Sequence, residues 1–271
     1  FTSGGSEADN QAILSAARLG ERKGKKHIIS TAFEHHAVLH TLQKLEKEGF
    51  EVELLPVGEI GTVTAEQVKA AIRPDTCLVT IMYANNEIGS VLPIAEIGAV
   101  CKEAGVLFHT DAVQAAGHLH INVQEQNIDM LSLSGHKFHG PKGVGVLYAR
   151  KGIILTNIIE GGAQERGKRA GTENIPGIVG MAAALNTELQ IGKSGITENV
   201  VRQAEEALAA RELIKGRVLD NSLLSAREAC DALCEACGAD GVLVIGSKFV
   251  LFKQNEKDPK IVLINDRKGK K

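Results

Sequence analysis

The chain has 271 residues, of which 44% are hydrophobic and 3% aromatic, with no tryptophan and a formal net charge of −2. This length allows one large or two medium domains, and their core has to be mainly aliphatic. The small net charge gives no electrostatic reason to expect a nucleic-acid or membrane partner for the whole chain, and no apolar run is long enough to cross a bilayer.

Strands alternate with helices along the first part of the chain. A glycine-bearing turn over residues 2–10 precedes a helix over 11–19, and the apolar spacing then changes repeatedly between the strand and helix periods. The expected strands cover residues 26–31, 51–57, 77–83, 106–110, 129–133 and 144–149, and further helices cover 37–48, 65–72 and 94–104. Such alternation predicts an α/β fold with a mostly parallel sheet between helices.

The pattern changes near residues 182–190, where a small α+β domain is expected to begin. Its helices are expected over 197–210 and 226–237, and its strands over 213–219, 242–246, 248–253 and 260–264. We therefore expect a first domain over 1–185, a second over 186–265 and a disordered basic tail over 266–271. No linker-like composition separates the domains, so residues 181–185 should continue as one helix. Because the chain opens at Phe1 inside a strand–loop–helix unit, we expect the first domain to be truncated at both ends.

A lysine and an aspartate stand at the ends of two of these strands. Lys137 follows the strand 129–133 within Ser-Gly-His-Lys, and Asp111 follows the strand 106–110. A desolvated lysine amine can form a Schiff base with an aldehyde, and an aspartate can hold a protonated pyridine nitrogen; pyridoxal 5′-phosphate (PLP) needs both. Taken singly, a lysine after a strand is more often a solvated loop residue and an aspartate a helix cap.

Other polar segments accompany this pair. Gly5 and Ser6 precede the first helix, where free backbone N–H groups bind anions, although a capped helix start has the same pattern. Asn86 follows the strand 77–83, and its side-chain amide either donates a hydrogen bond to a ring oxygen or simply stabilises a turn. His35 follows the strand 26–31, and its imidazole either stacks on an aromatic ring or is simply an exposed polar group. The glycine-rich loop over 161–174 is expected to line a site or an interface.

Together these motifs closely resemble the cysteine desulfurases, PLP enzymes of the class V aminotransferase group, over residues 1 to about 185. The resemblance implies a PLP-dependent transferase fold, an L-cysteine-type substrate, a homodimer, and sulfur mobilisation for iron–sulfur cluster or thio-cofactor assembly. It implies Lys137 and His35 as catalytic residues, Lys137 holding PLP and His35 stacking on its ring. The remaining implied cofactor residues are Asp111 at the ring nitrogen, Gln114 and Asn86 at the ring oxygen, Gly5, Ser6, Ser134 and His136 at the phosphate, and Thr172 at the phosphate of the partner subunit.

The cysteines depart from the pattern of that family. Its members pass sulfur to a nucleophilic cysteine on a loop of a smaller C-terminal domain, and this chain leaves the pattern near Leu185. None of its cysteines matches that nucleophile: Cys77, Cys101, Cys230, Cys234 and Cys237. We therefore expect impaired persulfide chemistry. The cysteines form no disulfide framework or metal site and no signal peptide is visible, so we expect a cytoplasmic protein.

The second part carries a different candidate site, the Gly-Lys-Ser-Gly turn at 192–195. A P-loop would need glycine where Thr187 stands, so we reject that interpretation. A Gly-x-x-Gly turn can instead lie against a nucleic-acid backbone. Residues 191–263 resemble the YhbY family of RNA-binding CRM domains, which is associated with ribosome assembly. The resemblance implies RNA contact by Gly192, Lys193, Ser194, Gly195 and Lys215, with Arg217 and Lys248 as weaker candidates. The alternative function is therefore an RNA-binding module carrying an inactive α/β passenger.

Overall fold

The computed structural model describes residues 1–138, 140–185 and 189–255. The chain divides into two compact units, Phe1–Ala184 and Leu185–Lys271, which are described separately. The expected strand over 260–264 and the tail over 266–271 lie outside the described residues, as do residues 186–188 at the expected domain boundary.

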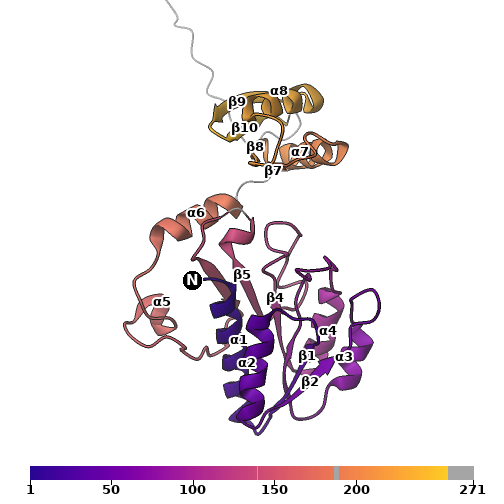
Figure 1. The fold of residues 1–271 in the computed structure, drawn as a ribbon, viewed down its shortest axis with the longest axis vertical. Helices are drawn as coiled ribbons and strands as arrows, with labels where there is room; N and C mark the ends of the chain where they lie inside the picture. Colours follow the sequence, from indigo (N-terminus) through magenta and orange to yellow (C-terminus); the bar gives the residue numbers. More distant parts are fainter. Residues whose placement is uncertain (139, 186–188, 256–271) are drawn as a thin grey trace, which may run out of the picture. The chain divides into compact units, whose positions relative to one another are not determined.

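The first unit is built on a six-stranded sheet with the order β2-β1-β3-β4-β5-β6 (Figure 1). Its strands are β1 (His27–Thr31), β2 (Glu51–Leu55), β3 (Thr76–Thr80), β4 (Leu107–Asp111), β5 (Met130–Ser134) and β6 (Gly145–Ala149). All neighbours pair in parallel except β5 and β6, which are antiparallel. The central strands β1 and β3 are buried along their whole length, as parallel strands covered on both faces are. The predicted α/β fold with a mostly parallel sheet is confirmed.

Helices cover both faces of this sheet. One face carries α1 (Gly5–Glu21) and α2 (His36–Lys47), and the other carries α3 (Ala65–Ala71) and α4 (Ile94–Ala104) (Figure 1). Each layer has its own apolar core, with Ile13, Ile28 and Leu42 in the first and Val79, Ile97 and Phe108 in the second. The unit closes with the 3-10 turn η1 (Gly135–Phe138), α5 (Gln164–Gly167) and α6 (Ile175–Leu185).

Most predicted bounds differ from the structure by one or two residues, and three differences are larger. The first helix begins at Gly5 instead of residue 11. Its first turn is polar and has no side-chain cap, so the sequence carries no signal for the start of a helix there. The strand expected over 77–83 ends at Thr80, after which the chain turns toward the site. The loop over 161–174 contains α5, but Glu165 and Arg166 have left-handed backbone angles there, with φ of 48° and 58°.

The second unit is a smaller α+β structure. Its sheet has the order β7-β8-β10-β9, with β7 and β8 parallel and β10 antiparallel to both of its neighbours. The elements are β7 (Leu189–Ile191), α7 (Glu198–Arg211), β8 (Leu213–Val218), α8 (Ala226–Cys237), β9 (Asp240–Ile245) and β10 (Lys248–Phe252). Strand β7 was not predicted, since three residues are too few to show a period. In neither unit do the described residues form a helix that is long and apolar enough to cross a membrane.

We predict that Gly98→Ala destabilises the first unit, although alanine favours helices by about 1 kcal/mol. A Cβ atom at Gly98 in α4 would overlap the backbone carbonyl oxygen of Gln126, which cannot yield as a flexible side chain would. We expect a net loss of about 1–3 kcal/mol of unfolding free energy, measured by urea denaturation. As a control, Ala99→Gly at the next, exposed position should cost only the helix-propensity difference of about 1 kcal/mol. An unchanged or higher midpoint for Gly98→Ala would contradict the packing.

Candidate functional site

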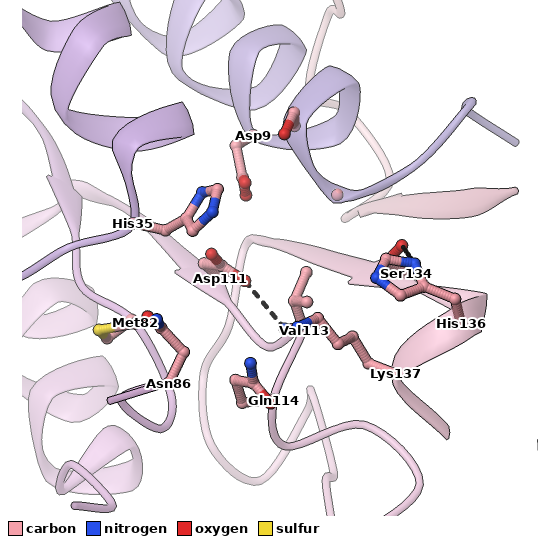
Figure 2. Close-up of a pocket in the computed structure, with 12 residues that line it drawn as sticks. Asp9, His35, Met82, Asn86, Asp111, Val113, Gln114, Ser134, His136 and Lys137 are labelled. Carbon is pink, nitrogen blue, oxygen red and sulfur yellow. Dashed lines mark hydrogen bonds between the residues drawn. The ribbon is translucent and has the colours of Figure 1, made fainter. Parts of the chain in front are cut away.

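A cavity of about 260 Å³ lies at the carboxyl ends of the central strands of the first unit. This is the edge of a parallel sheet at which α/β folds place their ligands. Figure 2 shows its side chains converging from α1, the start of α2, the strand ends and η1. Its lining consists of Gly5, Ser6, Asp9, His35, Met82, Asn86, Asp111, Val113, Gln114, Ser134, His136 and Lys137. The structure thus brings together all of the expected cofactor residues except Thr172.

Asp111 and Lys137 approach this cavity from two neighbouring strands. Asp111 ends β4 with 5% of its surface exposed, and one carboxyl oxygen accepts a hydrogen bond of 2.8 Å from the Val113 amide. Burial raises the pKa of Asp111, whereas that hydrogen bond and the charges of His35 and Lys137 lower it. Lys137 lies in η1 and is exposed, so the expected desolvated amine is not found here. The pair supplies one anion and one amine to a single cavity.

The amino end of α1 lies at the opposite wall. Gly4 precedes this helix and provides no side-chain cap, so the first-turn N–H groups of Gly5 and Ser6 stay available to an anion. Hydrogen bonds between the backbones of Thr2 and Gly145 fix this segment beside β6. A Cβ atom at Gly5 would come within 2.6 Å of the Val113 side chain, so the close approach requires glycine. Ser134 packs beside Gly4 and Gly5, and its Oγ atom lies 3.0 Å from His136 Nδ1.

Asn85, the neighbour of Asn86, builds the segment that presents Asn86. Its side-chain oxygen accepts from the amides of Glu87 and Ile88 at 2.9 and 3.0 Å. Its side-chain nitrogen donates to the Phe33 carbonyl at 3.1 Å. Asn85 is therefore buried and structural, while Asn86 is exposed and lines the cavity.

His35 has a second role that the sequence did not indicate. It caps α2, because its Nδ1 accepts a hydrogen bond of 3.1 Å from the Ala37 amide. This hydrogen bond orients the ring. The ring belongs to the cavity wall, as expected for a side chain that would lie against a planar ligand (Figure 2).

A buried polar cluster lies behind the cavity, and the sequence analysis missed it. Asp9 and Glu34 are 1% and 4% exposed, and His109 is fully buried. Glu34 Oε1 accepts from the Thr31 hydroxyl at 2.6 Å and from the Met82 amide at 2.9 Å. Burial raises the pKa of Glu34 to about 8 and lowers the pKa of His109 to about 3. A helical projection would have revealed Asp9, because it falls among the buried positions of α1.

The other expected site residues lie elsewhere. Thr172 is exposed and lines a different cavity of about 140 Å³, together with Arg169 and Glu165. In the second unit, the turn Gly192–Gly195 is closed by a 3.0 Å backbone hydrogen bond, with Lys193 and Ser194 exposed. It does not open a helix directly, since α7 begins after its cap Thr197.

None of the five cysteines is a thiolate candidate. All are free thiols, four are buried, and Cys234 is half-buried. Burial raises the pKa of Cys77 to about 11, of Cys101 to about 12 and of Cys234 to about 11, and it also raises the pKa of the other two. Within the described ranges, no group of three or more His, Cys, Asp or Glu side chains is placed to hold a metal ion.

Comparison with known proteins identifies relatives of this arrangement. The family model for class-V aminotransferases matches residues 1–223, which extends beyond the boundary expected at Leu185. The chain is 58% identical over 190 residues to the cysteine desulfurase IscS of Clostridium botulinum strain Hall, covering 70% of this chain and 48% of the relative. It is 58% identical over 189 residues to the cysteine desulfurase IscS of Methanosarcina thermophila, covering 70% and 46%.

Solved structures of a NifS-like protein and of SspA are also similar to this chain. A NifS-like protein has a TM-score of 0.66 at 40% identity, over 78% of this chain and 54% of that one. The structure of SspA in complex with cysteine has a TM-score of 0.65 at 36% identity, over 93% and 80%. The chain spans about half the length of the curated relatives it matches. These matches are to desulfurase-type proteins, so RNA binding by the second unit stays a prediction.

We predict that Glu34→Gln stabilises the protein more as the pH rises. The folded pKa of Glu34, about 8, lies above its unfolded value of 4.5, so folding has to keep the carboxyl protonated and loses stability as pH rises from 4.5 toward 8. Glutamine retains the hydrogen-bond acceptor for Thr31 and Met82 without this cost. The urea midpoint of the variant should therefore match the wild type near pH 4.5 and exceed it near pH 8. A difference that shrinks with rising pH would mean that Glu34 is ionised.

Proposed function

We propose that this chain, which belongs to the class-V aminotransferase family, binds PLP and is a cysteine desulfurase-like protein that acts on an L-cysteine-type amino acid. One observation carries the proposal: Lys137, Asp111 and the amino end of α1 line a single cavity. The 58% identity to curated cysteine desulfurases over these residues supports the same cofactor and substrate class.

The chemistry of the donors fits this cofactor. The uncapped amino end of α1, with Ser6, Ser134 and His136, offers backbone and side-chain donors to a phosphate. Asp111 is a buried carboxyl that can accept from a protonated ring nitrogen, and Asn86 and Gln114 offer amides to a ring oxygen. The part of the cavity between His35 and Lys137 suits a flat ring (Figure 2).

The roles of the side chains follow from these positions. When bound, PLP supplies an electron sink that stabilises negative charge at the α-carbon of an amino acid. Lys137 would hold the cofactor through its Nζ atom, and its amine is the group of this cavity that could accept a proton from an amino-acid substrate. Asp111 holds the ring-nitrogen proton, and the His35 ring limits the movement of the flat group along one face.

Sulfur transfer is the step for which the chain lacks a suitable group. A persulfide forms on a thiolate, and burial raises the pKa of Cys77, Cys101 and Cys234 to about 11 or 12. We therefore propose that the chain retains amino-acid activation and has impaired sulfur transfer to cluster or thio-cofactor assembly. The proposal includes a homodimer. Thr172 does not line the cofactor cavity of its own chain, and in the dimer it would reach the cofactor phosphate of the partner subunit.

We predict that added PLP is attached to Lys137. The purified chain should develop a visible absorbance band, and borohydride reduction followed by peptide mapping should place the label at residue 137. Lys137→Ala should lose both signals. Lys142→Ala is the matched control, because it removes an exposed lysine from the same turn region that does not line the cavity. A label scattered over surface lysines, or retained in Lys137→Ala, would refute the assignment.

A second candidate function is RNA binding by the second unit, and one arrangement favours it. Lys215 and Arg217 on β8 share a sheet face, because alternate residues of a strand point the same way. Lys248 on β10 pairs directly with Arg217 and therefore lies on this face. The helices α7 and α8 pack on the opposite face, through the core that contains Ile214, Phe249 and Leu251. The basic face and the turn with Lys193 present several cations to a phosphate backbone.

We predict that this unit binds single-stranded RNA with a strong salt dependence. Lys193→Ala and Lys215→Ala should each weaken binding and reduce the slope of log affinity against log salt by about one, because each removes one phosphate contact. Lys151→Ala, an exposed lysine of the first unit, is the control and should leave binding unchanged. No binding by the full chain at low salt, or equal effects of all three variants, would rule out this function.

A further inference from the structure

Asp9 is a carboxyl group in the buried face of α1, and the function proposed above does not use it. Its surface is 1% exposed, and it lines the cavity opposite Asp111 (Figure 2). Its Oδ1 atom is buried and has no hydrogen-bond partner among the described residues. A buried carboxylate with one unpaired oxygen and no countercharge costs roughly several kcal/mol of free energy, so its charge has to be neutralised.

His109 does not provide a countercharge. Its Nε2 atom lies 3.7 Å from Asp9 Oδ1, but the ring already lies between two hydroxyls, 2.8 Å from Thr80 Oγ1 and 2.9 Å from Ser132 Oγ. Burial lowers the pKa of His109 to about 3, so the ring is neutral at physiological pH. No lysine or arginine of the described part of the chain forms an ion pair with Asp9.

The neighbouring charges are mostly negative. Burial raises the pKa of Asp9 well above its ordinary value, and the charges of Asp111 and Glu34 raise it further, while a hydrogen bond from Ser132 partly offsets them. Burial raises the pKa of Asp111 as well. Unlike Asp9, however, Asp111 accepts a hydrogen bond from the Val113 amide and lies near the charges of His35 and Lys137, and these partly offset the effect of burial. Of the two carboxyls, Asp111 is the one that the surroundings favour as the anion.

We propose that Asp9 and Asp111 form a carboxyl pair that carries one negative charge and one proton, with the proton on Asp9. Asp9 is then a positioning residue, which keeps a single anion in the cavity and places it on Asp111. The pair matches a ligand with one cationic ring nitrogen. This last match rests on the proposed cofactor, whereas the pairing itself concerns the protein alone and is tested without PLP.

The test is a double-mutant cycle on the full chain freed of PLP, followed by urea denaturation at about pH 5 and about pH 8. Asp9 has a raised folded pKa, so the wild type loses stability as pH rises above the unfolded value. Asparagine needs no proton, so Asp9→Asn should raise the urea midpoint, and more at the higher pH. In the Asp111→Asn background the gain should be smaller, because the repelling charge of Asp111 is gone and only burial and the charge of Glu34 still raise the pKa of Asp9. The other titratable groups around the pair are the same in every variant of the cycle: Glu34, His35, His109, His136 and Lys137.

Asp129→Asn is the matched control for replacing a carboxylate. Asp129 accepts from Arg150 Nε at 2.6 Å and from the Phe108 amide at 3.0 Å, so its replacement should lower the midpoint. If Asp9→Asn behaves like Asp129→Asn, or if its gain is the same with and without Asp111, the proposal is overturned.

A second measurement does not depend on the folding of any variant. Infrared spectra of the wild-type chain, isotope-labelled at the aspartate side-chain carboxyl carbon, should show at neutral pH the carbonyl stretch of a protonated aspartic acid. The label separates this band from that of Glu34, which burial also keeps protonated up to about pH 8. Absence of a labelled band overturns the proposal. Failure of PLP binding would leave both measurements unaffected, so the two proposals fail separately.

Discussion

The site depends on the pairing register at the carboxyl ends of β4 and β5. Asp111 pairs with Ser132, and the Ala112 amide donates to the Ser132 carbonyl at 2.9 Å, which fixes the end of β4 against its neighbour. Two residues further along β5, Ser134 begins the turn that carries Lys137. The Tyr83 amide donates to the Asp111 carbonyl at 2.8 Å and brings the segment with Asn86 to the same edge. A slip of one residue would turn Asp111 into the opposite layer.

Such a sheet edge collects polar side chains in a place with little water, and this creates the electrostatic problem of the site. Three carboxyls, Asp9, Glu34 and Asp111, are buried within one region of the first unit. Glu34 is satisfied at one oxygen by Thr31 and Met82, and it remains neutral to about pH 8. If Asp9 is protonated as proposed and Glu34 is neutral, Asp111 is the one anion among the three carboxyls, and this is the charge that a pyridinium ring would require. Burying these carboxyls lowers the stability of the fold, and functional sites commonly give up stability in this way.

The sequence predicted the elements well wherever the local signals were strong. Helices α4 and α8 have the predicted bounds, because both end at a glycine in the left-handed conformation, Gly105 and Gly238. The start of α1 was placed six residues late, since glycine and polar residues with no side-chain cap look like a loop. In the site, the residues next to strand ends were found by their position. Asp9 and Met82 were missed, because only the packing of α1 and the chain after β3 bring them to the cavity. Val113 was missed because it is an apolar residue with no functional group, although it follows β4 directly after Asp111 and Ala112.

The central claim is that residues of the first unit alone hold PLP between Asp111 and Lys137. A crystal structure of the chain grown with PLP tests it most directly. The account predicts density continuous with Lys137 Nζ, the ring nitrogen at the Asp111 carboxylate, the ring against His35 and the phosphate at the amino end of α1. Density elsewhere, or a ring nitrogen turned away from Asp111, would contradict it.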